Sequence, residues 1–177
     1  MTRSNRVGVP ALLAIMLLAA QAAAQPSTVE AARALHVEGK ELRRAGDLRA
    51  SLEKLEAAHA LYATPITALE VGRGHALLGG YKKAIEVLAS IDALPVKPDA
   101  SARSAAARNE AQTLLVQYRA RLARLVLRVD GDGARVRVDG VLVPAEALGA
   151  PWPVDPGVHH VEAERGAQHT ADDVPLG

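Results

Sequence analysis

Apolar residues recur every three or four positions across residues 28–94, a spacing that predicts amphipathic helices. One apolar stripe consists of Leu35, Leu42, Leu48, Leu52 and Leu55, and a second of Val71, Leu78, Ile85 and Leu88. Glycine-containing phrases interrupt the stripes, as is typical of turns between short helices. We therefore expect this region to fold as a series of helical hairpins.

The helical region contains an internal repeat. The phrase RAGDLRASL, which begins at Arg44, is similar to LGGYKKAI, which begins at Leu78. Upstream of these phrases, Gly39 and Gly72 occupy matching places 33 residues apart. A period of this length is typical of solenoids built from helix–turn–helix units. An unrelated pair of helical hairpins is the alternative.

These residues resemble the tetratricopeptide repeat in their order of small, large and turn positions. The first copy contains Gly39, Leu42, Gly46-Asp47-Leu48, Ser51 and Ala58, with Pro65 slightly late. The second contains Gly72, Gly79-Gly80-Tyr81, Ala84 and Pro95, but has His75 where a large apolar residue is usual. The resemblance implies a short α-solenoid. Because two repeats rarely suffice alone, we expect a third helical layer at residues 98–124, capped by Asp99 or Ser101.

The apolar period changes to two after Leu125. Val136 and Val138 alternate with Arg135 and Arg137, which predicts a half-exposed strand. Asp139-Gly140 and several prolines supply turns, and residues 158–164 read as a further strand. The predicted fold is therefore α+β, with about five helices followed by a small antiparallel β-module at residues 125–177.

The β-rich region resembles the PEGA domain, a short module of bacterial envelope proteins that often accompanies tetratricopeptide repeats. The resemblance rests on GDGARVRVDG from Gly131 and on DPGVHHVEA from Asp155, although Gly131 and Ala147 replace prolines usual in the family. It implies no functional residues. Because the chain stops at Gly177, near where another strand is expected, we interpret the module as truncated. It would then have an open edge beside Val161 and Ala163, through which two copies could associate.

The N-terminal segment has the pattern of a secretory signal peptide. Arg3 and Arg6 precede an apolar run at residues 11–20, and alanines lead to an expected cleavage site after Ala24. The run is half the length of about 20 residues that a membrane span needs. We expect residues 1–24 to be removed, residues 25–97 to hold the repeats, and the protein to be periplasmic or otherwise associated with the cell envelope, without a stable membrane span. An uncleaved N-terminal anchor is the alternative.

Composition narrows the classes of function. The chain has 21 basic and 20 acidic side chains, so it lacks the basic excess of a nucleic-acid-binding protein. It has no Phe and no Cys, which excludes a large aromatic core, disulfides and thiolate metal sites. His160, Glu162 and Glu164 share one strand face, but alternation along a single strand does not gather metal ligands, and His159 points the other way. We therefore expect no metal, no cofactor and no enzymatic activity.

The first function hypothesis is a scaffold or interaction protein. In tetratricopeptide arrays the first helix of each repeat lines a concave groove, and this resemblance places two strips of residues there. The basic strip consists of Arg33, His36, Lys40, Arg43 and Arg44, and the second strip of Ile66, Leu69, Arg73 and Leu77. Such a groove would suit an acidic peptide with a hydrophobic anchor or a terminal carboxylate. An ordinary solvated helix face is the alternative, since Glu38 and Glu41 lie close in sequence.

The second function hypothesis is a binding module for a glycan or cell-wall polymer, led by the β-rich half. Trp152, the only Trp, lies between Pro151 and Pro153 and is the aromatic such a site would use. An enzyme is disfavoured because no nucleophile and base occur in a recognisable context.

Overall fold

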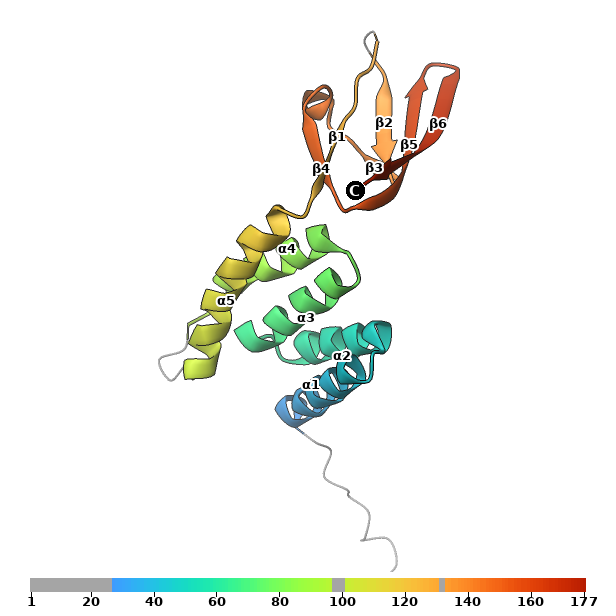
Figure 1. Ribbon diagram of the computed structural model, residues 1–177. Coiled ribbons are helices and arrows are strands. Elements are labelled where there is room, and N and C mark those ends of the chain that lie inside the picture. The colour runs from blue at the N-terminus through green and yellow to red at the C-terminus, as the bar shows by residue number, and fades with distance from the viewer. Residues whose placement is uncertain (1–26, 97–100, 131–132) are drawn as a thin grey trace, which may run out of the picture.

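The computed structural model describes residues 27–96, 101–130 and 133–177. An α-helical half is followed by an antiparallel β half at its far end (Figure 1), in agreement with the predicted α+β class and the expected five helices. The helices are α1 (Thr28–Arg44), α2 (Leu48–Leu61), α3 (Pro65–Leu77), α4 (Tyr81–Ser90) and α5 (Ala102–Arg119), with a 3-10 turn at Ile91–Ala93 after α4. The expected signal segment and Asp99 lie outside the described residues.

Short polar side chains define where the helices begin. The side chains of Ser27, Asp47, Thr64 and Ser101 each accept a backbone hydrogen bond at the start of α1, α2, α3 and α5. The start of α4 differs, because its N-cap residue is Gly80, which has no side chain to accept such a bond. The turns before α2 and α4 contain Gly46 and Gly79, both with positive φ.

The two helical hairpins repeat one close contact between backbones. A methyl group on Gly39 of α1 would lie 2.8 Å from Leu55 Cγ of α2, and one on Gly72 of α3 would lie 2.7 Å from Leu88 Cγ of α4. Leu55 and Leu88, one from each of the predicted apolar stripes, are fully buried, at 1% and 0% exposed. Glycine at the facing position lets the helices approach this closely.

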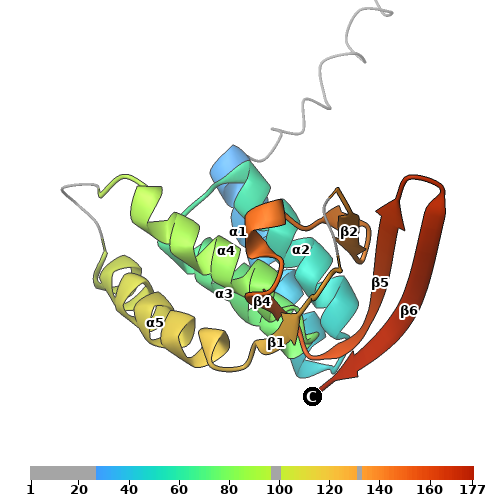
Figure 2. The same ribbon diagram turned by 90° about the horizontal axis from the view of Figure 1, so that it is seen from above.

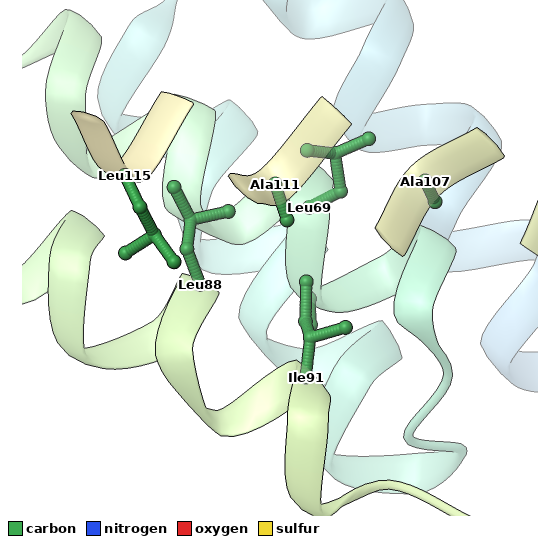
Figure 3. Packing of buried hydrophobic residues seen from close by; sticks show 7 residues of the cluster. Leu69, Leu88, Ile91, Ala107, Ala111 and Leu115 are labelled. Atoms are coloured by element: carbon green, nitrogen blue, oxygen red, sulfur yellow. The ribbon is translucent and has the colours of Figure 1, made fainter. Parts of the chain in front are cut away.

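The fifth helix completes the helical core. Figure 3 shows Ala107, Ala111 and Leu115 of α5 against Leu69, Leu88 and Ile91, and all six are buried. The small alanines allow α5 to lie close to α3 and α4. Leu115 is buried in this core, whereas Leu114 and Tyr118 of α5 are only partly buried against it. The third layer was expected to run to residue 124, but α5 ends at Arg119.

The β half consists of two antiparallel sheets. Strands β1 (Ala123–Val126) and β4 (Pro151–Val154) form a pair, and the second sheet has the order β3-β2-β5-β6. Its strands are β2 (Arg135–Val138), β3 (Val141–Leu142), β5 (Gly157–Arg165) and β6 (Gln168–Leu176). The sheets enclose a core of Leu125, Leu127, Val136, Val138, Val143 and Val154. The β half begins at Ala123, two residues before the predicted boundary.

The expectation of an open edge beside Val161 and Ala163 is wrong. Strand β6 pairs with β5 along nine positions, from Gly157 opposite Leu176 to Arg165 opposite Gln168, and forms the outer ribbon in Figure 2. The apolar pattern of the sequence did not predict this strand, because its first residues are polar and, within β6, only Val174 and Leu176 pack against the core. The edge on this side of the sheet is β6 itself. Its Asp172, Asp173 and Pro175 disfavour pairing with another chain. The basis for self-association through β5 is therefore removed.

Candidate docking site

An open hollow of about 770 Å³ lies on the helical half, beside the start of α4 and the end of α5. It is lined from α1, α3, the start of α4 and the end of α5 by Arg43, Arg73, Ala76, Leu77, Tyr81, Gln117, Tyr118, Ala120 and Arg121. Tyr81 is placed by the Gly79-Gly80 turn that begins α4. Arg121 is placed by the segment that joins α5 to β1.

A chain of ion pairs crosses one wall of the hollow. Glu70 of α3 is only 7% exposed, and Arg43 Nη2 of α1 lies 2.6 Å from its Oε2. Arg73 Nη1 lies 2.9 Å from Glu70 Oε1, and Arg73 also pairs with Glu110 of α5. Burial raises the pKa of Glu70, but the hydrogen bond from Arg43 and the charges of Arg43 and Arg73 lower it further, so its pKa lies below the ordinary value. The ionised carboxylate therefore ties α1 to α3, and the pair between Arg73 and Glu110 ties α5 to α3.

This arrangement leaves Arg121 as the cation that is available for binding. Arg43 and Arg73 are held by Glu70 and Glu110, which neutralise most of their charge. The Arg121 side chain is exposed and makes no hydrogen bond or ion pair with the residues that the structure describes. A free guanidinium presents paired N–H donors that match a carboxylate or phosphate.

Aromatic and aliphatic groups form the other wall. The rings of Tyr81 and Tyr118 are tilted by 54° with their centroids 5.6 Å apart. Burial raises the pKa of Tyr118, so its hydroxyl stays protonated at neutral pH. Leu77 is 53% exposed beside them. The hollow can thus hold an anionic group at Arg121 and an apolar or aromatic side chain against Leu77 and the tyrosines.

The structure brings only part of the predicted groove together. Arg43, Arg73 and Leu77 line the hollow, whereas Arg33, His36, Lys40 and Arg44 lie elsewhere on α1, and Arg44 pairs with Glu41. Burial lowers the pKa of His36, which is half-buried and faces Glu70.

The prediction that Ile66 and Leu69 form an exposed apolar strip is wrong. Leu69 is 4% exposed and belongs to the helical core, with Ile66 packed against that core. The reason is that α5 covers this part of α3. The groove positions of the second repeat were predicted by analogy with the first repeat, and this analogy did not account for a third helical layer over α3.

Among the polar and aromatic side chains of the hollow, sequence reasoning missed Tyr81, Gln117, Tyr118 and Arg121. Three of them lie near the end of α5, which the sequence predicted only as a third helical layer. Their spacing of one and three residues was the available signal. It would have identified them if α5 had been treated as the first helix of a third repeat.

The predicted polymer contact, Trp152, is half-buried rather than exposed. It lies on β4 and packs against the β core, and Lys82 Nζ of α4 lies 5.7 Å from its ring centroid. A sugar ring could stack on this face only after Lys82 moved away. No feature of the described structure favours this second hypothesis over the hollow.

The two neighbouring histidines of β5 have different environments, as the sequence predicted. His159 is 7% exposed, whereas His160 is exposed and its Nδ1 lies 2.8 Å from Asp173 Oδ1. Among the described residues, no three His, Cys, Asp or Glu side chains are grouped so that they could hold a metal ion. Within the same residues, no helix is both long enough and apolar enough to cross a membrane.

Three comparisons with known proteins gave no match. A scan against protein-family models matched none of them, and searches of the curated proteins and of the solved structures found no similar protein.

Proposed function

We propose that this chain is an exported cell-envelope protein whose helical half docks an acidic segment of a partner protein in the hollow. The observation that carries the proposal is Arg121, which has no side-chain partner among the described residues, in one hollow with Tyr81, Tyr118 and Leu77. A carboxylate of the partner would bind Arg121, and a neighbouring apolar side chain would pack against Leu77 and the tyrosines.

The proposal includes the architecture that the sequence resembles. Helices α1–α5 would be a short tetratricopeptide-like solenoid, an interpretation supported by the contact that recurs between Gly39 and Leu55 and between Gly72 and Leu88. The β half would be a PEGA-like module, supported by the buried His159 and the Asp139-Gly140 turn that joins β2 to β3. Export rests on the signal-like residues 1–24, and N-terminal sequencing of the fractionated protein should find Gln25 at the start of the mature chain.

Site-specific cross-linking in living cells tests the docking site. A photo-reactive amino acid at Leu77 should capture a partner through the hollow, whereas the same probe at Leu61 should not. Leu61 is a suitable control because it is also exposed but lies on α2, away from the hollow. Mass spectrometry of the adduct then identifies the partner and the segment that reacts.

A charge reversal distinguishes recognition by Arg121 from general attraction to a basic surface. Arg121→Glu should abolish the Leu77 adduct, and Arg119→Glu, which makes the same change two residues away outside the hollow, should leave it intact. Binding of the identified segment should also weaken as salt is added. Equal capture by wild type and Arg121→Glu, with the chain still folded, would rule out the hollow as the docking site.

A further inference from the structure

The imidazole ring of His159 joins two separate turns of the β half, because each ring nitrogen contacts an oxygen atom of one turn. Its Nδ1 is 2.6 Å from Asp139 Oδ2, in the turn between β2 and β3. Its Nε2 is 2.6 Å from the backbone oxygen of Asp155, in the turn between β4 and β5. The His159 side chain is 9% exposed, so the ring is largely shielded from water, although the Asp139 side chain is 50% exposed.

The geometry requires a proton on each ring nitrogen. An ionised carboxylate and a backbone carbonyl only accept hydrogen bonds, so both ring nitrogens must donate, and only the imidazolium can do so. A neutral ring would leave one nitrogen lone pair facing an oxygen lone pair at 2.6 Å. His159 is therefore held in its charged form.

The same Asp155 connects the β half to the helical half. Its Oδ1 accepts a hydrogen bond of 2.7 Å from the backbone N of Lys82, in the first turn of α4. The carboxylate supplies the cap that Gly80 does not provide at this helix start, where a negative charge is favourable. Lys82 also places its ammonium group over Trp152 of β4. Lys82 of α4 thus attaches the helical half to Asp155 and Trp152 of the β half, in addition to the covalent segment between α5 and β1.

We propose that the imidazolium of His159 is a pH-sensitive latch that holds the Asp155 turn against α4, and that loss of its proton frees the β half to move relative to the helices. Asp139 is fixed independently, because its Oδ1 accepts from the backbone N of His160 and its own N donates to the His160 oxygen. The Asp155 turn is therefore the side that yields when the ring becomes neutral.

The charged groups around the ring set the pH at which the latch opens. Lys82, Lys83 and Glu86 of α4 line a cleft of about 350 Å³ with His159, Asp139 and Asp155, and Lys83 pairs with Glu86. On the other face of β5, His160 pairs with Asp173, and His160 Nε2 lies 3.8 Å from Glu162 Oε1. Among the described residues that line this cleft, Lys82 is the cation without a carboxylate partner. Asp139 and Asp155 each place an oxygen atom in contact with the His159 ring.

The direction of the pH response follows from these contacts. Burial lowers the pKa of His159, but the hydrogen bonds to Asp139 and Asp155 and their charges raise it further, so it lies above its ordinary value of 6.5. The hydrogen bond from His159 lowers the pKa of Asp139 below its ordinary value of 3.8. The latch is therefore closed from mildly acid to neutral pH and opens as pH rises through the raised pKa of His159.

Nuclear magnetic resonance of the full chain tests the latch by two independent readouts. The ring nitrogens of His159 give its titration, and backbone 15N relaxation gives the rotational correlation time of each half. We expect one shared correlation time while His159 is protonated and two different times above its measured pKa, with amide shift dispersion showing that both halves stay folded. Asp173→Asn, which removes the carboxylate beside the exposed His160, is the matched control and should behave as wild type.

Two variants distinguish the latch from a purely structural histidine. Asp155→Ala removes the cap on α4 but keeps the backbone oxygen, so the halves should tumble independently at every pH while His159 still titrates above 6.5. Asp139→Asn should lower the pKa of His159 and move the separation to lower pH. The proposal is overturned if His159 titrates at or below 6.5, if shared tumbling persists above its pKa, or if Asp155→Ala still tumbles as one body.

Discussion

Gly72 and Leu88 lie so close together that α3 and α4 tolerate no side chain between them. A methyl group on Gly72 would lie 2.7 Å from both Cγ and Cδ2 of Leu88, whereas carbon atoms in ordinary contact are about 3.5–4.0 Å apart. Gly39 and Leu55 repeat this relationship between α1 and α2. The 33-residue repeat in the sequence is therefore the repeat of one packing contact.

We predict that Gly72 and Leu88 are energetically coupled. Gly72→Ala should destabilise the chain by about 1–3 kcal/mol through overpacking, and Leu88→Ala should cost about 2–5 kcal/mol through the cavity it leaves. In the double variant the new methyl group fills part of that cavity, so the loss should be smaller than the sum. Urea denaturation of the four proteins measures the coupling.

Gly80→Ala is a suitable control for this cycle. Gly80 has a negative φ, and a methyl group there would lie 3.4 Å from its nearest neighbour, the His75 oxygen. The substitution should therefore change stability much less than Gly72→Ala. Strict additivity between Gly72→Ala and Leu88→Ala would show that the two residues do not share this contact.

Periodicity predicted the elements whose burial repeats regularly. The fully buried Leu55 and Leu88 and the strand with buried Val136 and Val138 were identified correctly, and Ser101 is one of the two caps that the sequence offered for α5. Strand β6 was missed because it is an edge strand, where pairing depends on backbone hydrogen bonds and its polar side chains carry no apolar alternation.

The candidate site was harder to predict because it depends on tertiary packing. The local sequence around Arg43 and Arg73 shows two cations, but their neutralisation by Glu70 appears only when α1 and α3 are packed together. The contribution of Arg121 likewise depends on where α5 ends. Tertiary contacts therefore determine that Arg43 and Arg73, which the sequence predicted, are neutralised, and that Arg121, which it did not predict, is available.

We predict that Glu70 stabilises the helical half through its two arginines. Glu70→Gln should cost about 1–3 kcal/mol, because the arginines lose a buried ionised partner and gain only a neutral amide. Glu38→Gln is the matched control. Its ion pair with Lys54 is 2.9 Å long but largely exposed, so its loss should cost less than about 1 kcal/mol. Equal effects of the two substitutions in urea denaturation would contradict the structural role of Glu70.

Hydrogen exchange should distinguish the strands of the β half. Strand β5 is paired on both sides, whereas β6 is paired only with β5. The amides of β5 should therefore exchange most slowly in the β half, and those on the outer side of β6 should exchange fast. We also expect residues 123–177 to exchange faster than residues 31–94, because they form a separate and smaller core. Uniformly slow exchange across β6 would indicate that its edge is covered by another chain.

The two halves should respond to pH in opposite directions. In the helical half, burial lowers the pKa of His36 and of His59, so folding favours their neutral forms. Their contribution is present above the ordinary value of 6.5 and is lost as pH falls through their lowered pKa values. The stabilising contribution of ionised Glu70 is lost only at lower pH, since the pKa of Glu70 lies below its ordinary value of 4.5. The raised pKa of His159 gives the β half the reverse dependence, a loss as pH rises above 6.5.

Separate probes can follow this divergence in one sample. Trp152, the only Trp, reports on the β half by fluorescence, and circular dichroism at helical wavelengths reports on α1–α5. Between about pH 5 and 8, the urea midpoint of the helical signal should rise, and that of the fluorescence signal should fall toward the alkaline end. Replacing His36 and His59 together by Gln should flatten the first profile and leave the second unchanged, because neither residue contacts the β half. Parallel profiles for the two probes would show that the halves unfold as one unit, and the assignment of opposite responses to separate histidines would then be wrong.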